Sequence, residues 1–203
     1  MVIAEIDQQN GRLAEVTLEK EFGKDRVIFV QTDVGEEASV QNLYRLSIMA
    51  FGKVDAVINN ATIAVLGEVK DLPIEEWDRS YRVNLRGPVL MARTFLPDMI
   101  ERDHGVFVCV SSTGTAFLGG YETFKAAQVH LANTLDAELE GTGVIAYTSG
   151  ATVALFLLAM VEALFADGRV ALGAADGAVR GVDAVRELAA RFPAERVAAR
   201  CGI

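Results

Sequence analysis

The amino-acid sequence predicts an open α/β fold, in which helices cover both faces of a parallel β-sheet. Short apolar runs alternate with stretches of helical periodicity along residues 1–150. The apolar runs are nearly continuous in Val and Ile, which is typical of strands buried on both faces of a parallel sheet. Because strands and helices alternate, right-handed crossover connections are expected to join the strands.

The same patterns place the individual elements. Strands are expected at 2–6, 27–31, 55–59, 106–110 and 144–148. Helices are expected at roughly 8–22, 36–51, 75–102 and 121–140.

The composition changes after Gly150. Residues 151–203 contain 15 alanines and no lysine, and six acidic residues balance six arginines. Helices are expected near 153–166 and 182–192, with a glycine-rich loop near 168–181 and no convincing final strand. We expect a single domain over 1–203, with a core at 1–150 and an Ala/Arg-rich C-terminal region at 151–203.

Composition and charge exclude several classes of function. The 203-residue chain has a net charge of −9, which argues against binding to nucleic acid or to an anionic membrane surface. No apolar run reaches the length of a membrane span, and residues 1–11 lack the pattern of a signal peptide. Cys109 lies in an apolar strand, so a buried free thiol is favoured over a disulfide with the distant Cys201. A cytoplasmic protein is expected.

The stretch GGYETFKAAQ at 119–128 places Tyr121 and Lys125 four residues apart, on one face of the expected helix. A neighbouring ammonium favours the phenolate form of a tyrosine, and such a phenol can exchange a proton with an alcohol or carbonyl group. The alternative is that two amphipathic side chains share this face by chance.

Two serines, Ser111 and Ser112, end the strand VFVCV. They are expected at the carboxyl edge of the sheet, where open α/β folds bind ligands. A serine hydroxyl there could polarise the carbonyl that Tyr121 protonates. Considered alone, the two serines are better explained as strand termination or a helix cap.

Six short motifs occur in a characteristic order. They are VIAEID (2–7), TDV (32–34), NNA (59–61), VNLRG (83–87), SS (111–112) and YETFK (121–125). In this order, residues 2–150 resemble the short-chain dehydrogenase/reductase family. The resemblance implies a Rossmann-like, doubly wound parallel sheet and hydride exchange between NAD(H) and an alcohol or ketone of small size.

The resemblance also implies roles for individual residues. Tyr121 would be the general acid/base, and Lys125 would favour its phenolate and bind the nicotinamide ribose. Both residues would also belong to the cofactor-binding set. Ser112, rather than Ser111, would orient the substrate oxygen. Asn84 would hold a water in the proton relay. No metal ion is assigned a role.

The implied cofactor residues follow the first three strands. Asp33 and Val34 would contact adenine, Asn60 and Ala61 would line the nucleotide cleft, and Glu5 would bind the adenosine ribose. A carboxylate at Glu5 repels a 2′-phosphate, so NAD is favoured over NADP. Asp7 is an alternative for the ribose contact, although a helix N-cap explains it at least as well.

The sequence departs from the family at its N-terminal end. The family opens with a strand and a glycine-rich turn that cradles the cofactor pyrophosphate, whereas this chain starts at the equivalent of the second strand. In the family the first strand lies between the second and fourth, so two strands here would lack a neighbour. Three explanations are open: a longer gene with an upstream start, which we prefer, re-pairing of the strands, or a partner that fills the gap.

A smaller departure follows the NNA motif, where Thr62 replaces the family's usual glycine and could crowd the cleft.

Three functions are open for this sequence. The first is an NAD-dependent oxidoreductase. The second is a catalytically silent relative or gene fragment. The third is an interaction module, since helices 75–102 and 121–140 commonly form the homodimer or homotetramer interface in this family.

Overall fold

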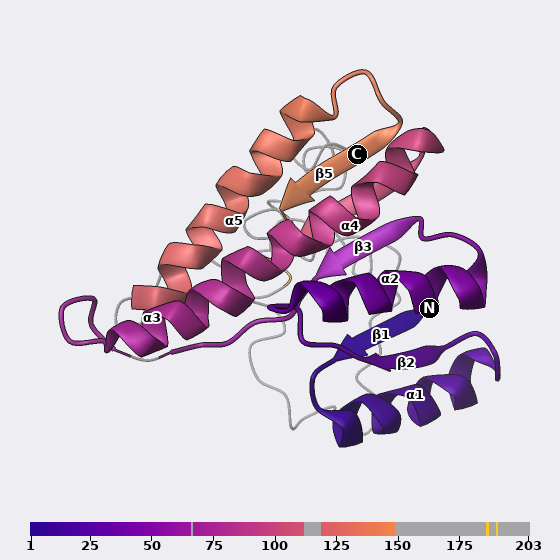
Figure 1. Ribbon diagram of the computed structural model, residues 1–203, viewed down its shortest axis with the longest axis horizontal. Coiled ribbons are helices and arrows are strands. Elements are labelled where there is room, and N and C mark those ends of the chain that lie inside the picture. Colours follow the sequence, from indigo (N-terminus) through magenta and orange to yellow (C-terminus); the bar gives the residue numbers. More distant parts are fainter. Residues whose placement is uncertain (66, 112–118, 149–185, 187–189, 191–203) are drawn as a thin grey trace. The chain divides into compact units, whose positions relative to one another are not determined.

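The computed structural model describes residues 1–65, 67–111 and 119–148, together with positions 186 and 190 (Figure 1). The first compact unit of the chain is Met1–Thr148. Its boundary falls two residues before Gly150, where the composition changes. The helices expected near 153–166 and 182–192, and the loop near 168–181, lie outside the described residues except for those two positions.

Strands and helices alternate through this unit, as the sequence predicts. The described elements are, in order, β1 (Val2–Glu5), α1 (Gln8–Phe22), β2 (Ile28–Gln31), α2 (Glu37–Phe51), β3 (Ala56–Asn59), α3 (Ile74–Tyr81), the π-helical turn η1 (Arg82–Arg86), α4 (Gly87–Glu101), β4 (Gly105–Cys109), α5 (Gly119–Glu138) and β5 (Val144–Thr148). The expected strand and helix limits agree with these within two residues. One difference is that residues 74–101 form two α-helices separated by a π turn, rather than one helix.

The ends of α1 show how local sequence sets an element. The side chain of Asp7 accepts a hydrogen bond from the Asn10 amide at 2.7 Å, which caps the first turn. Gly23 ends the helix with a positive φ of 98°, a conformation that glycine adopts without strain. The N-cap explanation of Asp7 is therefore confirmed.

The strands form two parallel half-sheets. β1 pairs with β2, and β3, β4 and β5 pair in that order. Figure 1 shows β1 and β3 pointing the same way, yet these two strands are not hydrogen-bonded to each other. One explanation open from the sequence was that the two strands without a neighbour, β1 and β3, pair with each other. The structure does not show this pairing.

Helices cover both faces of the β1–β2 half-sheet. The ring of Phe29 packs on Gly11 of α1, whereas Val30 joins Val40 and Leu43 of α2 in the core. Neighbouring residues of a strand face opposite sides, so α1 and α2 lie on opposite faces. This arrangement is that of a doubly wound sheet.

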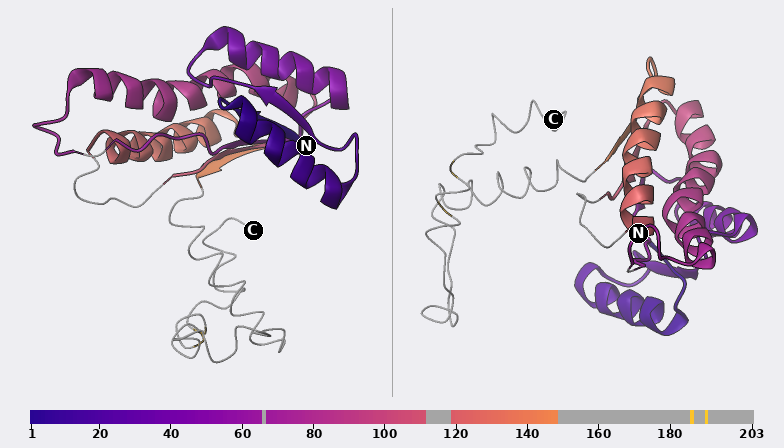
Figure 2. Two further views of the ribbon diagram at one scale, coloured as in Figure 1. Left: turned by 90° about the horizontal axis from the view of Figure 1, so that it is seen from below. Right: turned by 90° about the vertical axis from the view of Figure 1, so that its left-hand side faces the viewer.

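The three-stranded half-sheet is packed by α4 and α5 on one face (Figure 2). Phe107 and Cys109 are fully buried on that face, beside Ala146. On the other face Ile58 and Ile145 are 64% and 54% exposed. None of the described residues therefore covers these apolar side chains fully.

A single core links the two half-sheets. It runs from Val30 through α2 and α4 to β4 and α5, and the rings of Tyr44 and Phe95 meet edge to face at 5.3 Å within it. The half-sheets are therefore linked by packing of α2 on α4 and by bonds from Arg82 and Arg86 to the segment after β2, not by a shared strand. Of the helices described, none has the length and apolarity to cross a membrane.

Gly143 provides a stability prediction, because a Cβ there would overlap the backbone oxygen of Asp103. The Gly143 amide also donates to the Asp103 carboxylate at 2.6 Å, so the two backbones are held together. We expect Gly143→Ala to lower the free energy of unfolding by about 3 kcal/mol, since backbone must move.

The matched control is Gly141→Ala, where nothing lies within 4 Å and the only cost is a φ of 85°. It should cost about 1 kcal/mol. Urea denaturation measures both, and equal losses would contradict the close approach at Gly143.

Candidate active site

The expected catalytic pair lies at the carboxyl end of β4. The Lys125 side chain is 2% exposed, and its ammonium donates a hydrogen bond to the Val110 carbonyl at 2.5 Å. The Lys125 nitrogen lies 5.8 Å from the centre of the Tyr121 ring. The Ser111 hydroxyl donates to the Lys125 backbone oxygen at 2.8 Å. The structure thus brings Tyr121, Lys125 and Ser111 together, as the sequence predicts for the edge of a parallel sheet.

Burial changes the proton affinity of two groups here. It lowers the pKa of Lys125, while the nearby Cys109 and Glu122 act in the opposite direction. Burial also raises the pKa of the Cys109 thiol to about 11, with the Lys125 charge opposing it. Lys125 therefore loses its proton more readily than a solvated lysine does.

Cys109 is a buried free thiol, as predicted, and should be unreactive in the native protein. The thiolate is the reactive form, and a pKa of about 11 leaves very little of it at pH 8. In a Cys201→Ser variant, which isolates Cys109, we expect Ellman's reagent to label the thiol only after denaturant is added. Rapid native labelling would contradict the burial of this side chain.

Ser112, the preferred substrate-orienting serine, lies outside the described residues, as do 113–118. Its role therefore stays a prediction. Ser111 is described, and its hydroxyl is engaged with the backbone of α5.

Asn84, which is fully buried in the π turn, occupies the centre of a hydrogen-bond network. Its amide nitrogen donates to the Ile63 carbonyl at 2.8 Å and to the Ser80 hydroxyl at 3.0 Å. Its side-chain oxygen accepts from the Ile63 amide at 3.0 Å and from the Thr62 hydroxyl at 2.9 Å. These four bonds use the full capacity of the amide. From the sequence, Thr62 was expected only to crowd the cleft. In the structure its hydroxyl makes one of the four hydrogen bonds to the Asn84 side chain.

Gln128 is a further member of this hydrogen-bond network, and the sequence did not predict it. Its side-chain amide, fully buried, donates to the backbone oxygen of Asn84. A relay water at Asn84 would therefore bind the backbone oxygen next to Gln128, because the Asn84 side chain is already saturated. Gln128 follows Lys125 by three residues and shares its helix face, but nothing in the sequence separates it from other core-facing polar residues.

The expected nucleotide-binding residues are also assembled in one place. A cavity of about 780 Å³ is lined by residues from β1 and β3 and from the loops that follow β1, β2 and β3. Five of the seven expected cofactor contacts line it, namely Glu5, Asp33, Val34, Asn60 and Ala61, whereas Tyr121 and Lys125 do not. Carboxyl ends of parallel strands form the usual nucleotide site of this kind of fold.

Two acids of this cavity are held in place. Asp33 accepts from the Gly35 amide at 2.9 Å and forms an ion pair with Arg82 of the π turn. Glu5 accepts from the Asp7 amide at 3.0 Å. The carboxylates of Glu5, expected at the ribose, and of Asp33, expected at adenine, are thus restrained at the wall of the cavity. Both roles stay predictions.

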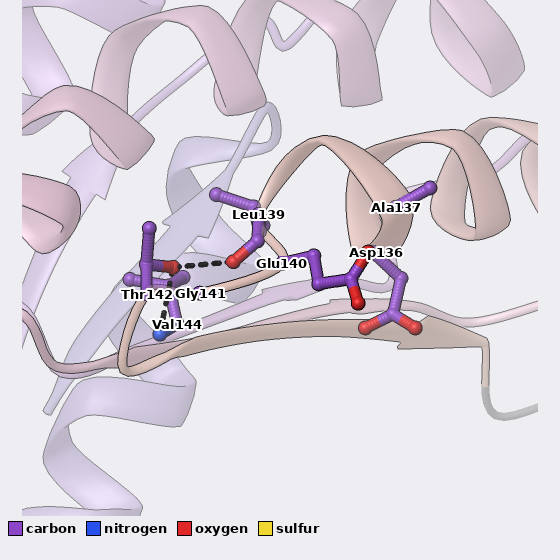
Figure 3. Close-up of a pocket in the computed structure, with 7 residues that line it drawn as sticks. All are labelled: Asp136, Ala137, Leu139, Glu140, Gly141, Thr142 and Val144. Atoms are coloured by element: carbon purple, nitrogen blue, oxygen red, sulfur yellow. Dashed lines mark hydrogen bonds between the residues drawn. The ribbon is translucent and has the colours of Figure 1, made fainter.

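A smaller hollow of about 360 Å³ lies between the end of α5 and the start of β5 (Figure 3). The Thr142 hydroxyl there donates to the Leu139 carbonyl at 2.7 Å and accepts from the Val144 amide at 3.2 Å. None of the expected site residues lines it, and it sits at the amino end of β5. It has no part in the candidate site.

The fold and these residues define the class of protein as a doubly wound α/β protein with a cavity at the carboxyl ends of its strands. The sequence profile described as short chain dehydrogenase matches residues 1–155. The chain belongs to the short-chain dehydrogenase family.

Individual relatives agree with this assignment. An uncharacterised oxidoreductase of Thermotoga maritima is 42% identical over 113 residues, which cover 56% of this chain and 43% of the relative. The BbsD subunit of (2S)-[(R)-hydroxy(phenyl)methyl]succinyl-CoA dehydrogenase from Thauera aromatica is 33% identical over 124 residues, covering 59% of this chain and 49% of the subunit. The chain spans about half the length of the curated relatives it matches.

Solved structures show the same similarity. A short-chain dehydrogenase/reductase from Burkholderia phymatum in complex with NAD is 29% identical with a TM-score of 0.68, covering 73% of this chain and 54% of that one. A 3-ketoacyl-(acyl-carrier-protein) reductase from Brucella melitensis complexed with NADH is 28% identical with a TM-score of 0.68, covering 72% and 62%.

Proposed function

We propose that the protein is an NAD(H)-dependent oxidoreductase acting on an alcohol or carbonyl substrate of small size. The observation that supports this most directly is the placement of Lys125 beneath the Tyr121 ring at the carboxyl end of β4. The five nucleotide-type residues around one cavity are the second support. A proton-transfer pair and a nucleotide cleft are the two parts that such a reaction needs.

In the proposed mechanism, bound nicotinamide supplies or accepts a hydride, and the protein handles the proton. Tyr121 gives a proton to the substrate oxygen or takes one from it. Lys125 favours the phenolate of Tyr121 through its charge and binds the nicotinamide ribose. Ser112 orients the substrate oxygen, and a water on the Asn84 backbone oxygen passes the proton onward.

Glu5 is proposed to set the cofactor preference. It lines the cavity at the tip of β1, where a carboxylate accepts hydrogen bonds from ribose hydroxyls and repels a 2′-phosphate. NAD is therefore proposed over NADP. The NAD and NADH in the two similar solved structures support a nicotinamide dinucleotide.

We also propose a cytoplasmic homodimer or homotetramer formed through the helices at 75–102 and 121–140. These helices pack on each other through Phe124, whose ring lies 5.8 Å from Trp77 and 5.8 Å from Tyr81. Ile74 and Ile100 are 69% and 43% exposed on the same helical run. Such exposed apolar residues support an interface here.

The test of the proposal is a titration of the protein with NADH, followed by fluorescence and calorimetry. We expect saturable binding below millimolar concentration, with weaker binding of NADPH. A Glu5→Gln variant should lose most of the discrimination between the two, while its circular dichroism spectrum stays unchanged. No binding signal at millimolar NADH would overturn the enzyme proposal for this chain.

A further inference from the structure

The side chain of Gln128 is fully buried, yet its amide is only half paired within the described part of the chain. Its nitrogen donates to the Asn84 backbone oxygen, whereas its oxygen has no partner among the described residues. We propose that Gln128 is a positioning residue of the proton relay, whose unpaired oxygen holds a buried water beside the Lys125 ammonium and the Asn84 backbone oxygen. The proposal rests on the proposed function, to which it adds the role of Gln128.

The bond to Asn84 fixes the direction of the Gln128 amide. In an α-helix the Asn84 backbone oxygen would accept from the amide of residue 88, but that residue is Pro88, which has no N–H. The Gln128 nitrogen supplies a donor to this oxygen instead. The reverse orientation of the amide would set two oxygens against each other, so the unpaired atom is the Gln128 oxygen.

The unpaired oxygen of Gln128 is an exception within the protein. Of the buried side-chain nitrogen and oxygen atoms in the described ranges, it is the one without a hydrogen-bond partner. Native proteins leave few buried polar atoms unpaired, and buried waters commonly provide the missing bonds. Such a water needs polar partners of its own, typically two to four in number.

Lys125 provides the second partner for this water. It precedes Gln128 by three residues on α5, so the two side chains share one face of the helix. The Lys125 side chain is 2% exposed, and of its three donors one is used among the described residues, by the Val110 carbonyl. A water that accepts from the Lys125 ammonium can donate to both the Gln128 oxygen and the Asn84 backbone oxygen. All three protein groups are buried, so the water would be held away from bulk solvent.

A second contact at the start of α5 keeps this arrangement rigid. Gly120 is buried, and a Cβ added to it would lie 3.6 Å from the Ser80 side chain. The Ser80 hydroxyl in turn accepts from the Asn84 side chain at 3.0 Å. The helix α5 therefore meets the Asn84 network at two points, Gly120 and Gln128, and the candidate catalytic pair lies between them.

The proposed water completes the proton balance of the reaction. In carbonyl reduction Tyr121 gives its proton to the substrate oxygen and recovers one through Lys125. Lys125 takes a proton from the buried water, and the water takes one from solvent, so each group returns to its starting state. Gln128 neither gives nor takes a proton, but keeps the water within reach of Lys125.

The first test concerns the water and needs no turnover. NMR detects a long-lived water through a nuclear Overhauser cross-peak to nearby protein protons, and rotating-frame spectra separate this cross-peak from proton exchange. The probe is the side-chain amide of Gln128, assigned through bonds to its own backbone. We expect a water cross-peak to these protons in the wild-type protein, and slow exchange of the protons themselves, because the amide is buried.

The second test is Gln128→Met, which nearly preserves the volume of the side chain and removes both amide groups. We expect the turnover number to fall by roughly 10- to 100-fold, since the relay loses its fixed geometry. The KM values for NADH and for the best substrate from a panel of small ketones should stay unchanged. Imidazole in the buffer should restore most of the lost rate, because a soluble base can carry the proton. Gln41→Met is the matched control, since Gln41 is exposed on α2, and it should retain full turnover.

Two results would overturn the proposal. One is a wild-type protein without the water cross-peak, and this result decides the matter even if Gln128→Met fails to fold. The other is a loss of turnover in Gln128→Met that imidazole does not restore, which would show that Gln128 only supports the fold. A wild-type protein that shows the cross-peak but no turnover would instead overturn the proposed function, and the relay role with it, while the water site at Gln128 stands.

Discussion

Tyr121→Phe is expected to lower the turnover number by roughly 10²- to 10⁴-fold, the usual contribution of a general acid/base. The substitution removes one hydroxyl and leaves the ring that packs above Lys125. Cofactor affinity should change little, because the ring and the buried ammonium remain. Steady-state kinetics with a panel of small alcohols and ketones, together with NADH binding, measures both quantities.

Tyr147→Phe is the matched control, since Tyr147 is 45% exposed on β5 and lies outside the candidate site. It should retain full turnover. A further variant is Lys125→Ala. It should weaken both turnover and cofactor binding, because the Lys125 ammonium is proposed to favour the Tyr121 phenolate and to bind the nicotinamide ribose. Undiminished turnover in Tyr121→Phe would show that another group transfers the proton.

Asn84→Leu is expected to lower the free energy of unfolding by roughly 3 kcal/mol or more, since each stranded buried polar group costs about 1–3 kcal/mol. The side chain has similar volume but no hydrogen-bonding groups. It would strand the Ser80 hydroxyl, which is fully buried, and both backbone groups of Ile63. Urea denaturation monitored by circular dichroism measures the loss.

Thr62→Val is the control for this network, because it removes a single bond to Asn84 and keeps the shape of the side chain. Its cost should be about 1 kcal/mol. If Asn84→Leu costs no more than Thr62→Val, then the four bonds of Asn84 contribute little to stability.

Most of the fold could be predicted because local sequence determines it. Continuous Val and Ile runs mark strands such as β4, and Asp7 and Gly23 mark the ends of α1. The π turn at Arg82–Arg86 could not be predicted in the same way. Its apolar periodicity continues across the break, and the bonds that hold it come from Ile63 and Gln128, which are distant in sequence.

The candidate site, too, could be predicted from local sequence only in part. The position of Lys125 beside Tyr121 follows from helix geometry, and the grouping of Glu5, Asp33 and Asn60 follows from the parallel sheet. The ion pair between Asp33 and Arg82 joins residues 49 positions apart, so no local pattern indicates it. Contacts of this kind depend on how the helices pack, which propensity and periodicity do not encode.

The interrupted sheet also has a consequence for cooperativity. The β1–α1–β2 unit is joined to the remainder by packing of α2 on α4 and by bonds from Arg82 and Arg86 to the segment after β2, without a shared ladder of backbone bonds. Units joined in this way open separately, at a lower free energy than global unfolding. Opening of the half that contains Glu5 and Asp33 would therefore remove the walls of the cavity while the half that contains Tyr121 and Lys125 stays folded.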